Sequence, residues 1–195
     1  MPEKLLPNFK AGDLIGFSSY SLNGVIINLG TFGIPFYNLS HIGIVGMPPT
    51  NTPFLFESTT LATTPCIYNL KKCEGTQAHY LGNRINNYYG KVYHYPLAIP
   101  LTFQQKINLL EFLIKHLGQP YDYIGAIRAR DFSLIEKLIY RKPDLASMYC
   151  SEYVLAAIKH IDLLGNLSPE MNWSPNKLIR FAQKFGLVKR CVCLK

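Results

Sequence analysis

Tyr149-Cys150-Ser151-Glu152-Tyr153 opens the stretch that organises the rest of this sequence. The apolar residues that follow recur at the spacing of one helical face, at positions 154, 155, 158, 161 and 164, and Gly165-Asn166 is a helix-ending signal. The spacing predicts a helix with Ser147 as its N-cap and Cys150 in its first turn. Because unpaired N–H groups and the positive end of the helix dipole lie there, a thiolate is favoured over a thiol. Cys150 is therefore a candidate nucleophile, and an inert buried cysteine is the alternative.

Length and composition indicate one globular domain over residues 1–195. The chain has 195 residues, of which 48% are hydrophobic and 16% charged, and no internal repeat or low-complexity tract is visible. Lys and Arg total 20 against 12 Asp and Glu, which gives a formal charge of +8. This excess permits an anionic surface or polymer as a partner. The basic residues are scattered, however, so a solvated face is the simpler explanation.

Cysteine usage indicates a reducing compartment. The five cysteines are an odd number without the spacing of a disulfide framework. Cys191 and Cys193 would point to one side of a strand, but no second pair with His accompanies them, so we expect no metal site. Residues 1–13 lack the apolar core of a signal peptide, and the apolar residues 24–36 are too short and too interrupted by Gly and Pro to span a membrane. The cytoplasm or another reducing compartment is the expected location.

Strand patterns dominate the first half of the chain, and helical periodicity dominates the second. The predicted strands cover residues 12–17, 40–46, 53–58, 66–70, 91–95 and 187–194. Besides the helix that contains Cys150, the predicted helices cover residues 103–117, 124–142 and 175–185. Residues 71–89 are polar and are expected to form a surface excursion, and the apolar residues 25–29 either line a substrate entrance or pack in the core. This order indicates an α+β domain with a sheet backed by helices.

The predicted strands 40–46 and 53–58 form a hairpin. If its loop is centred near Pro49, Gly43 faces Leu55 and His41 faces Glu57 on the same side of the sheet. Opposed residues have Cβ atoms about 5 Å apart, so an imidazole and a carboxylate there can form a hydrogen bond. Gly43 would leave open space beside them. A slip of one residue would turn one partner to the other face.

These residues suit nucleophilic thiol catalysis. The chemistry needs a cysteine at a helix start, a histidine to take its proton and an acidic residue to orient the histidine. Cys150, His41 and Glu57 supply these three parts, with the cysteine last in the chain. A structural His–Glu cross-strand pair is the alternative for His41 and Glu57.

The sequence resembles the circularly permuted branch of the NlpC-type papain-like cysteine hydrolases, in particular the YiiX/YebB-like group. The matching pieces occur in the family's order and lie at residues 12–15, 40–45, 56–57, 118–123 and 149–154. The resemblance implies a permuted papain-like α+β fold with an antiparallel sheet packed against helices. It also implies Cys150 as nucleophile, His41 as general base and Glu57 as the residue that orients the imidazole. The backbone N–H of Cys150 would help to form an oxyanion hole.

Other residues of the matching pieces are candidates for lining the site, namely Tyr121, Tyr149 and Ser40. Asp122 is better suited to anchoring its loop or capping the helix that follows it, because Asx residues are common caps. The chemistry requires no metal or organic cofactor. The polar residues 71–89 and the apolar residues 25–29 depart from the family pattern, and they leave the substrate open.

The resulting hypothesis is a thiol hydrolase that cleaves an amide bond through an acyl-enzyme at Cys150. A peptide, a cell-wall muropeptide and a lipid-linked amide are the substrates that the resemblance allows. An acyltransferase or a lipid thiol-esterase would use the same three residues. A non-catalytic structural or virion-associated protein, binding a polyanion through its basic face, is the alternative from another class.

Overall fold

A six-stranded antiparallel sheet forms the centre of the described residues, which in this computed structural model are 7–19, 39–62, 64–128, 147–165 and 173–195. The strands are β1 (Leu14–Ser19), β2 (His41–Gly46), β3 (Phe54–Thr59), β4 (Gly75–Tyr80), β5 (Gly90–Tyr95) and β6 (Val192–Cys193), in the order β4-β3-β2-β1-β5-β6. The helices are α2 (Leu81–Asn86), α3 (Phe103–Lys115), α4 (Tyr123–Arg128), α5 (Cys150–His160) and α6 (Pro175–Lys184). The predicted α+β class with an antiparallel sheet is confirmed.

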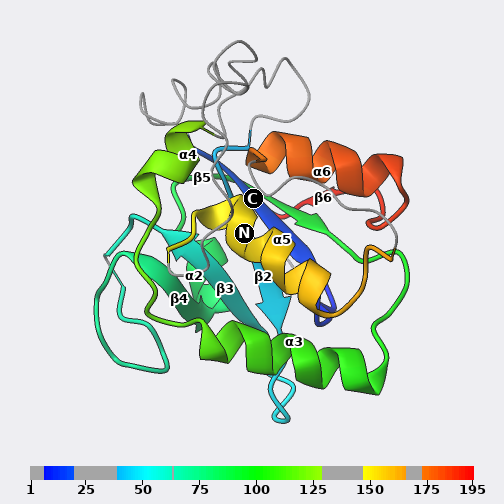
Figure 1. The fold of residues 1–195 in the computed structure, drawn as a ribbon, viewed down its shortest axis with the longest axis horizontal. Helices are drawn as coiled ribbons and strands as arrows, with labels where there is room; N and C mark the ends of the chain where they lie inside the picture. Colours follow the sequence, from blue (N-terminus) through cyan, green and yellow to red (C-terminus); the bar gives the residue numbers. More distant parts are fainter. Residues whose placement is uncertain (1–6, 20–38, 63, 129–146, 166–172) are drawn as a thin grey trace, which may run out of the picture.

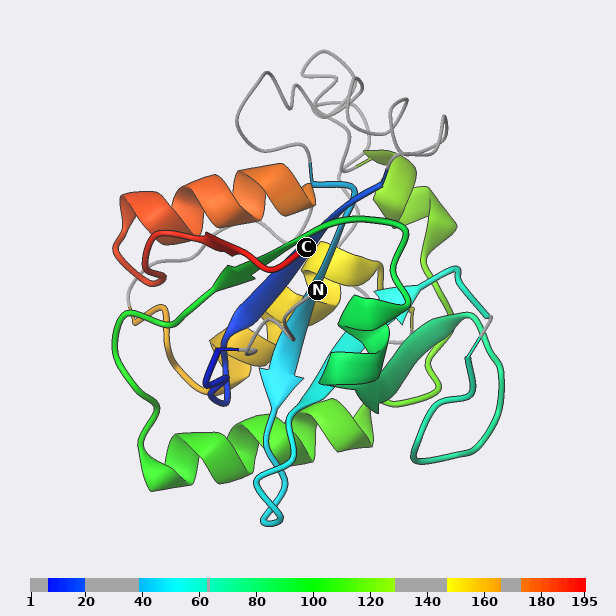
Figure 2. The ribbon, with the colours of Figure 1, turned by 180° about the vertical axis from the view of Figure 1, so that it is seen from behind.

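Helices cover the sheet unequally. Figure 1 shows α3, α5 and α6 on one face, and Figure 2 shows α2 on the other. The larger hydrophobic core lies under α5 and includes Ile42, Ile44 and Phe56. The smaller core lies under α2 and includes Phe17 and Leu55. Successive residues of a strand point to opposite faces, so each central strand contributes to both cores.

Helix α5 begins later and ends earlier than the sequence predicts. Its N-cap is Tyr149 rather than Ser147, which makes Cys150 the first helical residue. The cause lies in Met148, whose N–H donates to the Pro120 carbonyl at 3.2 Å and whose carbonyl accepts from Ser58 Oγ at 2.5 Å. These bonds hold the backbone outside the helix. At the other end α5 stops at His160, and the chain continues as a turn to residue 165.

The β2–β3 register differs from the predicted one by two residues. Val45 pairs with Leu55, because the hairpin is centred on Thr50 rather than Pro49. The Asn51 N–H donates to the Pro48 carbonyl at 2.9 Å, and Asn51 has a φ of 58°, which a short polar side chain tolerates. The loop covers residues 47–53, one residue more on the β3 side than the predicted loop 47–52.

This shift leaves the side-chain faces unchanged, because the side-chain period of a strand is two. His41 and Glu57 still share a face, but they are diagonal neighbours and do not lie directly opposite each other. The expected open space at Gly43 is wrong. A Cβ there would lie 2.8 Å from Leu55 Cδ1 and 2.9 Å from the Phe56 carbonyl oxygen.

The fourth strand lies where the sequence indicated a surface excursion. Residues 66–70, predicted as a strand, form a turn closed by a bond from the Leu70 N–H to the Cys66 carbonyl at 2.8 Å. β4 instead covers Gly75–Tyr80, and α2 follows it at once. The polar composition was misleading because the polar side chains of β4 are buried with partners; Gln77, for example, donates to the Cys73 carbonyl at 3.0 Å.

The remaining elements follow the sequence closely. The predicted strands at 12–17 and 91–95 are β1 and β5, and the helix with the Thr102 capping box is α3. Ser174 caps α6 by accepting from the Lys177 N–H at 3.3 Å. Only residues 192–193 of the predicted last strand form β6. Most of the predicted helix 124–142 and all of residues 25–29 lie outside the described residues. Among the described helices, none has the length and apolar character needed to cross a membrane.

Candidate active site

His41 and Glu57 form a short, buried hydrogen bond. Nε2 of His41 lies 2.5 Å from Oε2 of Glu57. The Glu57 side chain is fully buried, and the His41 side chain is 14% exposed. His41 and Glu57 are therefore close enough for the predicted contact although they are diagonal neighbours, since diagonal neighbours remain within reach of long side chains.

Cys150 meets His41 at the end of the sheet. His41 is the first residue of β2, and Cys150 is the first residue of α5. His41 and Glu57 share the sheet face that α2 covers, whereas α5 packs on the other face. Cys150 therefore reaches the imidazole around the end of β2. Because Glu57 holds Nε2, the nitrogen left for the thiol is Nδ1.

The surroundings of His41 favour its protonated form. Burial lowers the pKa of its imidazole, but the side chains of Cys150 and Glu57 outweigh burial and raise the pKa from 6.5 to about 9. Hydrogen bonds and negative charge next to a cation stabilise it in this way. The arrangement is therefore suited to an imidazolium that lies between an anionic carboxylate and a cysteine.

Arg84 is a site residue that the sequence reasoning missed. Its Nε donates to Glu57 Oε1 at 2.6 Å, and one terminal nitrogen lies 3.2 Å from Oε2. Burial raises the pKa of Glu57, but Arg84 and His41 outweigh burial and hold this pKa well below its usual range. Arg84 lies within residues 71–89, interpreted as a surface excursion. The signal that could have located it is the apolar pair Leu81 and Ile85, which marks a short helix with a buried face.

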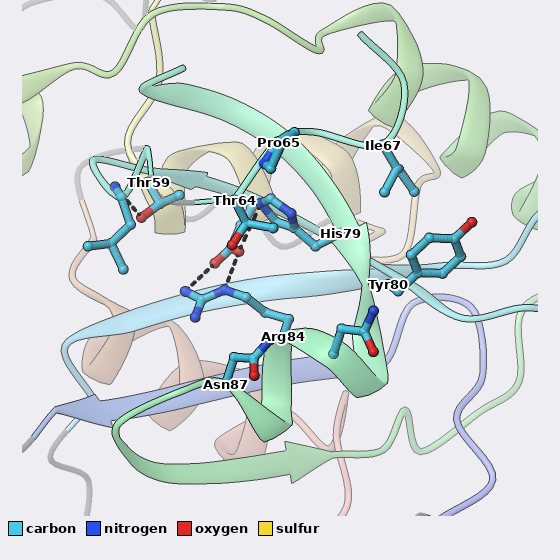
Figure 3. Close-up of a pocket in the computed structure, with 11 residues that line it drawn as sticks. Thr59, Thr64, Pro65, Ile67, His79, Tyr80, Arg84 and Asn87 are labelled. Atoms are coloured by element: carbon cyan, nitrogen blue, oxygen red, sulfur yellow. Dashed lines mark hydrogen bonds and ion pairs between the residues drawn. The ribbon is translucent and has the colours of Figure 1, made fainter. Parts of the chain in front are cut away.

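A small cavity of about 100 Å³ lies behind Glu57. Figure 3 shows Arg84 reaching across it, with His79 and Thr64 on the opposite side. His79 Nε2 lies 3.9 Å from Glu57 Oε1 and 2.9 Å from the Gln77 side-chain oxygen. Burial lowers the pKa of His79 further than Glu57 raises it, so the ring is neutral near pH 7. Arg84 is therefore the cation that balances Glu57 on this side.

The other predicted lining residues have structural roles. Ser40 Oγ accepts from the Ser19 N–H at 3.3 Å and donates to the Phe17 carbonyl at 3.3 Å, which secures the start of β2. Tyr149 is buried as the N-cap of α5, and burial together with Glu152 and Cys150 raises the pKa of its hydroxyl well above the usual value.

Tyr121 and Asp122 belong to the loop before α4. Tyr121 packs against Tyr123, with ring centroids 5.0 Å apart. The Asp122 carboxylate accepts from the Gly125 N–H at 2.8 Å, which confirms the predicted capping role. This loop reaches α5 through Pro120, whose carbonyl binds the Met148 N–H. Both residues therefore lie in a segment that supports the start of α5.

The described residues contain no group of three or more His, Cys, Asp and Glu side chains arranged to hold a metal ion. At the site itself, both Glu57 oxygens are occupied by His41 and Arg84. A metal ion at Glu57 would have to displace a guanidinium already bound there.

The described residues thus define an α+β domain in which a cysteine, a histidine and a glutamate gather at one end of an antiparallel sheet. In fold, the chain is similar to the metalloprotein YiiX from Escherichia coli O157:H7, with a TM-score of 0.55 over 95% of this chain and 89% of that chain. The sequence identity is 20%, so the similarity concerns the fold. No protein-family model matches the chain, and no curated protein matches it in sequence.

Proposed function

We propose that the chain is a permuted papain-like cysteine hydrolase that cleaves an amide bond, with Cys150 as nucleophile. The observation that carries the proposal is the bond between His41 Nε2 and Glu57, which leaves Nδ1 for the cysteine at the start of α5. A base oriented by a carboxylate next to a nucleophile at a helix start is the arrangement that activates a thiol.

In the first half of the reaction, the Cys150 thiolate attacks the carbonyl carbon of the amide. The C–N bond then breaks, and the amine leaves with a proton from the His41 imidazolium. The product is a thioester between Cys150 and the acyl group. Negative charge on the carbonyl oxygen is stabilised by the N–H groups of the first helical turn, which have no acceptor within the helix.

In the second half, water attacks the thioester. The imidazole of His41 takes a proton from this water, the C–S bond breaks, and a carboxylic acid leaves the regenerated thiolate. Glu57 stays ionised throughout and stabilises the imidazolium each time it forms. A peptide, a muropeptide and a lipid-linked amide all fit this chemistry. An acyltransferase would replace the water with an amine or alcohol.

YiiX is a metalloprotein, but the residues of this site do not fit a metal ion. Arg84 already neutralises Glu57, and the described residues contain no group of three or more His, Cys, Asp and Glu side chains that could hold such an ion. No step of the proposed reaction passes through a metal.

Labelling with a thiol-reactive acyl probe, followed by peptide mapping, tests the proposal. We expect Cys150 to react fastest although it is only 5% exposed, and Cys150→Ala to lose this label. Cys193→Ala is the matched control, since Cys193 is exposed and lies away from the site. Labelling that simply follows exposure, with Cys193 modified and Cys150 inert, would contradict the proposal. Adding a soluble amine during turnover separates hydrolysis from acyl transfer by the product formed.

A further inference from the structure

Glu57 is held from two sides by residues of different elements. His41 of β2 binds Oε2, and Arg84 of α2 binds Oε1 through Nε and Oε2 through a terminal nitrogen. Arg84 is itself largely buried, with 13% of its side chain exposed. A planar guanidinium that contacts both oxygens of a carboxylate fixes the plane of that carboxylate.

The guanidinium is in turn held by two aromatic rings. Its central carbon lies 4.9 Å from the ring centroid of Phe17 and 5.3 Å from that of Tyr88. These cation–π contacts restrict the rotation of the long arginine side chain. Phe17 also packs against the His41 ring, with centroids 5.5 Å apart, so one aromatic residue touches both partners of Glu57.

The charges around Glu57 show why a cation is needed there. The titratable or charged groups that face it are His41 from β2, His79 from β4, Arg84 from α2 and the neighbouring Tyr88. Burial raises the pKa of the Tyr88 hydroxyl above its usual value, so Tyr88 is neutral near pH 7. His79 is neutral near pH 7, because burial outweighs its attraction to Glu57. A fully buried carboxylate without a permanent cation would take up a proton each time His41 became neutral. It could then no longer stabilise the imidazolium in the next step.

We propose that Arg84 is a positioning residue for the reaction: it keeps Glu57 ionised and correctly oriented, and it balances enough of that charge for His41 to release its proton. This inference rests on the proposed function. Arg84 acts through Glu57 and has no role of its own toward substrate. The two contributions of Arg84 require different chemical features. Orientation of the Glu57 carboxylate requires the two guanidinium donors that bind it together, whereas charge balance requires only a cation.

A double-mutant cycle tests this mechanism. Arg84→Met removes the charge, Arg84→Lys keeps the charge without the fork, and Glu57→Gln removes the group through which Arg84 acts. Arg190→Met is the matched control, because Arg190 is an exposed arginine distant in sequence from the site. Turnover of an amide substrate and the NMR titration of the His41 ring are measured for each variant. His41→Gln identifies the His41 signal among the histidines.

We expect Arg84→Met to lower turnover by at least about 10-fold and to move the His41 titration to higher pH by at least about 0.5 unit, because an uncompensated Glu57 retains the imidazolium proton. Arg84→Lys should leave the titration in place and lower turnover alone. In the Glu57→Gln background, Arg84→Met should cost no further turnover. The inference would be overturned if Arg84→Met lowered turnover as much in the Glu57→Gln background as in the wild-type background. It would also be overturned if Arg84→Met folded and left the His41 titration unchanged.

The experiment also separates this inference from the proposed function. If wild-type protein neither hydrolyses amides nor reacts at Cys150, the proposed function fails. The coupling of Arg84 to His41 through Glu57 is rejected separately, by a His41 titration that Arg84→Met leaves unshifted. If Arg84→Met does not fold, the Glu57→Gln/Arg84→Met double variant replaces it. That variant should fold, because no buried charge is left unpaired. Failure of the double variant to fold would show that Arg84 supports the structure independently of Glu57, and would overturn the inference.

Discussion

Ser58 and Met148 join the two halves of the candidate site through one hydrogen bond, from Ser58 Oγ to the Met148 carbonyl at 2.5 Å. Ser58 follows Glu57 in β3, and Met148 precedes Cys150 by two residues. The Met148 carbonyl is buried, so the bond is not replaced by water. The bond connects β3, which carries Glu57, to the segment that leads into α5, where Cys150 is the first residue.

Ser58→Ala should therefore affect both stability and turnover. The Met148 carbonyl would be left without this donor, at a cost of about 1–3 kcal/mol in the free energy of unfolding. Looser placement of Cys150 should also lower kcat with little effect on KM. Chemical denaturation and steady-state kinetics measure the two effects, and Ser40→Ala, a hydroxyl at the start of β2, serves for comparison. Equal kcat in Ser58→Ala and wild type would contradict this role.

Cys150→Ala should abolish amide hydrolysis and preserve the fold. The substitution removes one buried sulfur, which costs on the order of 1 kcal/mol, and leaves the helix start intact. Circular dichroism and thermal unfolding check the fold, and product formation checks the activity. If the variant unfolds while Cys66→Ala, another buried cysteine, does not, Cys150 is mainly a packing residue.

Glu57→Gln should reduce turnover by roughly 10²-fold or more, because the imidazolium loses the carboxylate that stabilises it. It should also change stability in acid. The pKa of Glu57 is lowered in the folded state, so its contribution is present above the unfolded value of about 4.5 and is lost as pH falls below it. Wild type and variant should therefore converge in stability on acidification. A constant difference from pH 7 to pH 3 would contradict the lowered pKa.

His41 should govern stability on the alkaline side. Its pKa is raised from 6.5 to about 9, so its contribution is fully present below pH 6.5 and is lost as pH rises toward 9. The shift corresponds to about 3 kcal/mol. Urea unfolding between pH 6 and pH 10 should show this loss in wild type and not in His41→Gln. Cys150→Ala should narrow the pH range over which this stability is lost, because Cys150 is one cause of the raised pKa of His41.

Gly75→Ala should destabilise the protein by at least about 2 kcal/mol, since it forces an alanine into the left-handed region. Gly75 has a φ of +106°, and a Cβ there would lie 1.9 Å from the Gln119 carbonyl oxygen. Gly186→Ala is the matched control, with a φ of +66° and no atom within 4 Å. Thermal unfolding of both variants should give the larger loss for Gly75→Ala. Equal losses would mean that the contact with Gln119 relaxes freely.

Local patterns were sufficient for the elements that carry the three predicted site residues. The periodicity after Cys150 defines α5 because its apolar face is continuous, and the contact of His41 with Glu57 survives because the register error was an even number of residues. The sequence could not give the exact pairing, since the Asn51 turn depends on one backbone conformation that several residues can adopt.

Arg84 and β4 could not be predicted, for a different reason. The polar residues of β4 are buried because distant groups satisfy them; Thr76 Oγ, for example, donates to the His116 carbonyl at 2.5 Å. Arg84 is buried because Glu57, 27 residues earlier, supplies the opposite charge. Polar composition predicts exposure only where no such partner exists, and the partner becomes visible only once the chain is folded.

The turn at residues 66–70 has a consequence for the behaviour of the protein at high concentration. β4 is an edge strand, and the backbone groups at the middle of its outer side are already used: the Ile67 N–H donates to the Ala78 carbonyl at 3.0 Å, and the Ala78 N–H points to the Cys66 sulfur at 3.4 Å. The opposite edge, β6, is only two residues long. Within the described part of the chain, a strand from a second molecule therefore finds its pairing positions on β4 partly occupied and only a two-residue strand at the other margin. Both features oppose edge-to-edge aggregation.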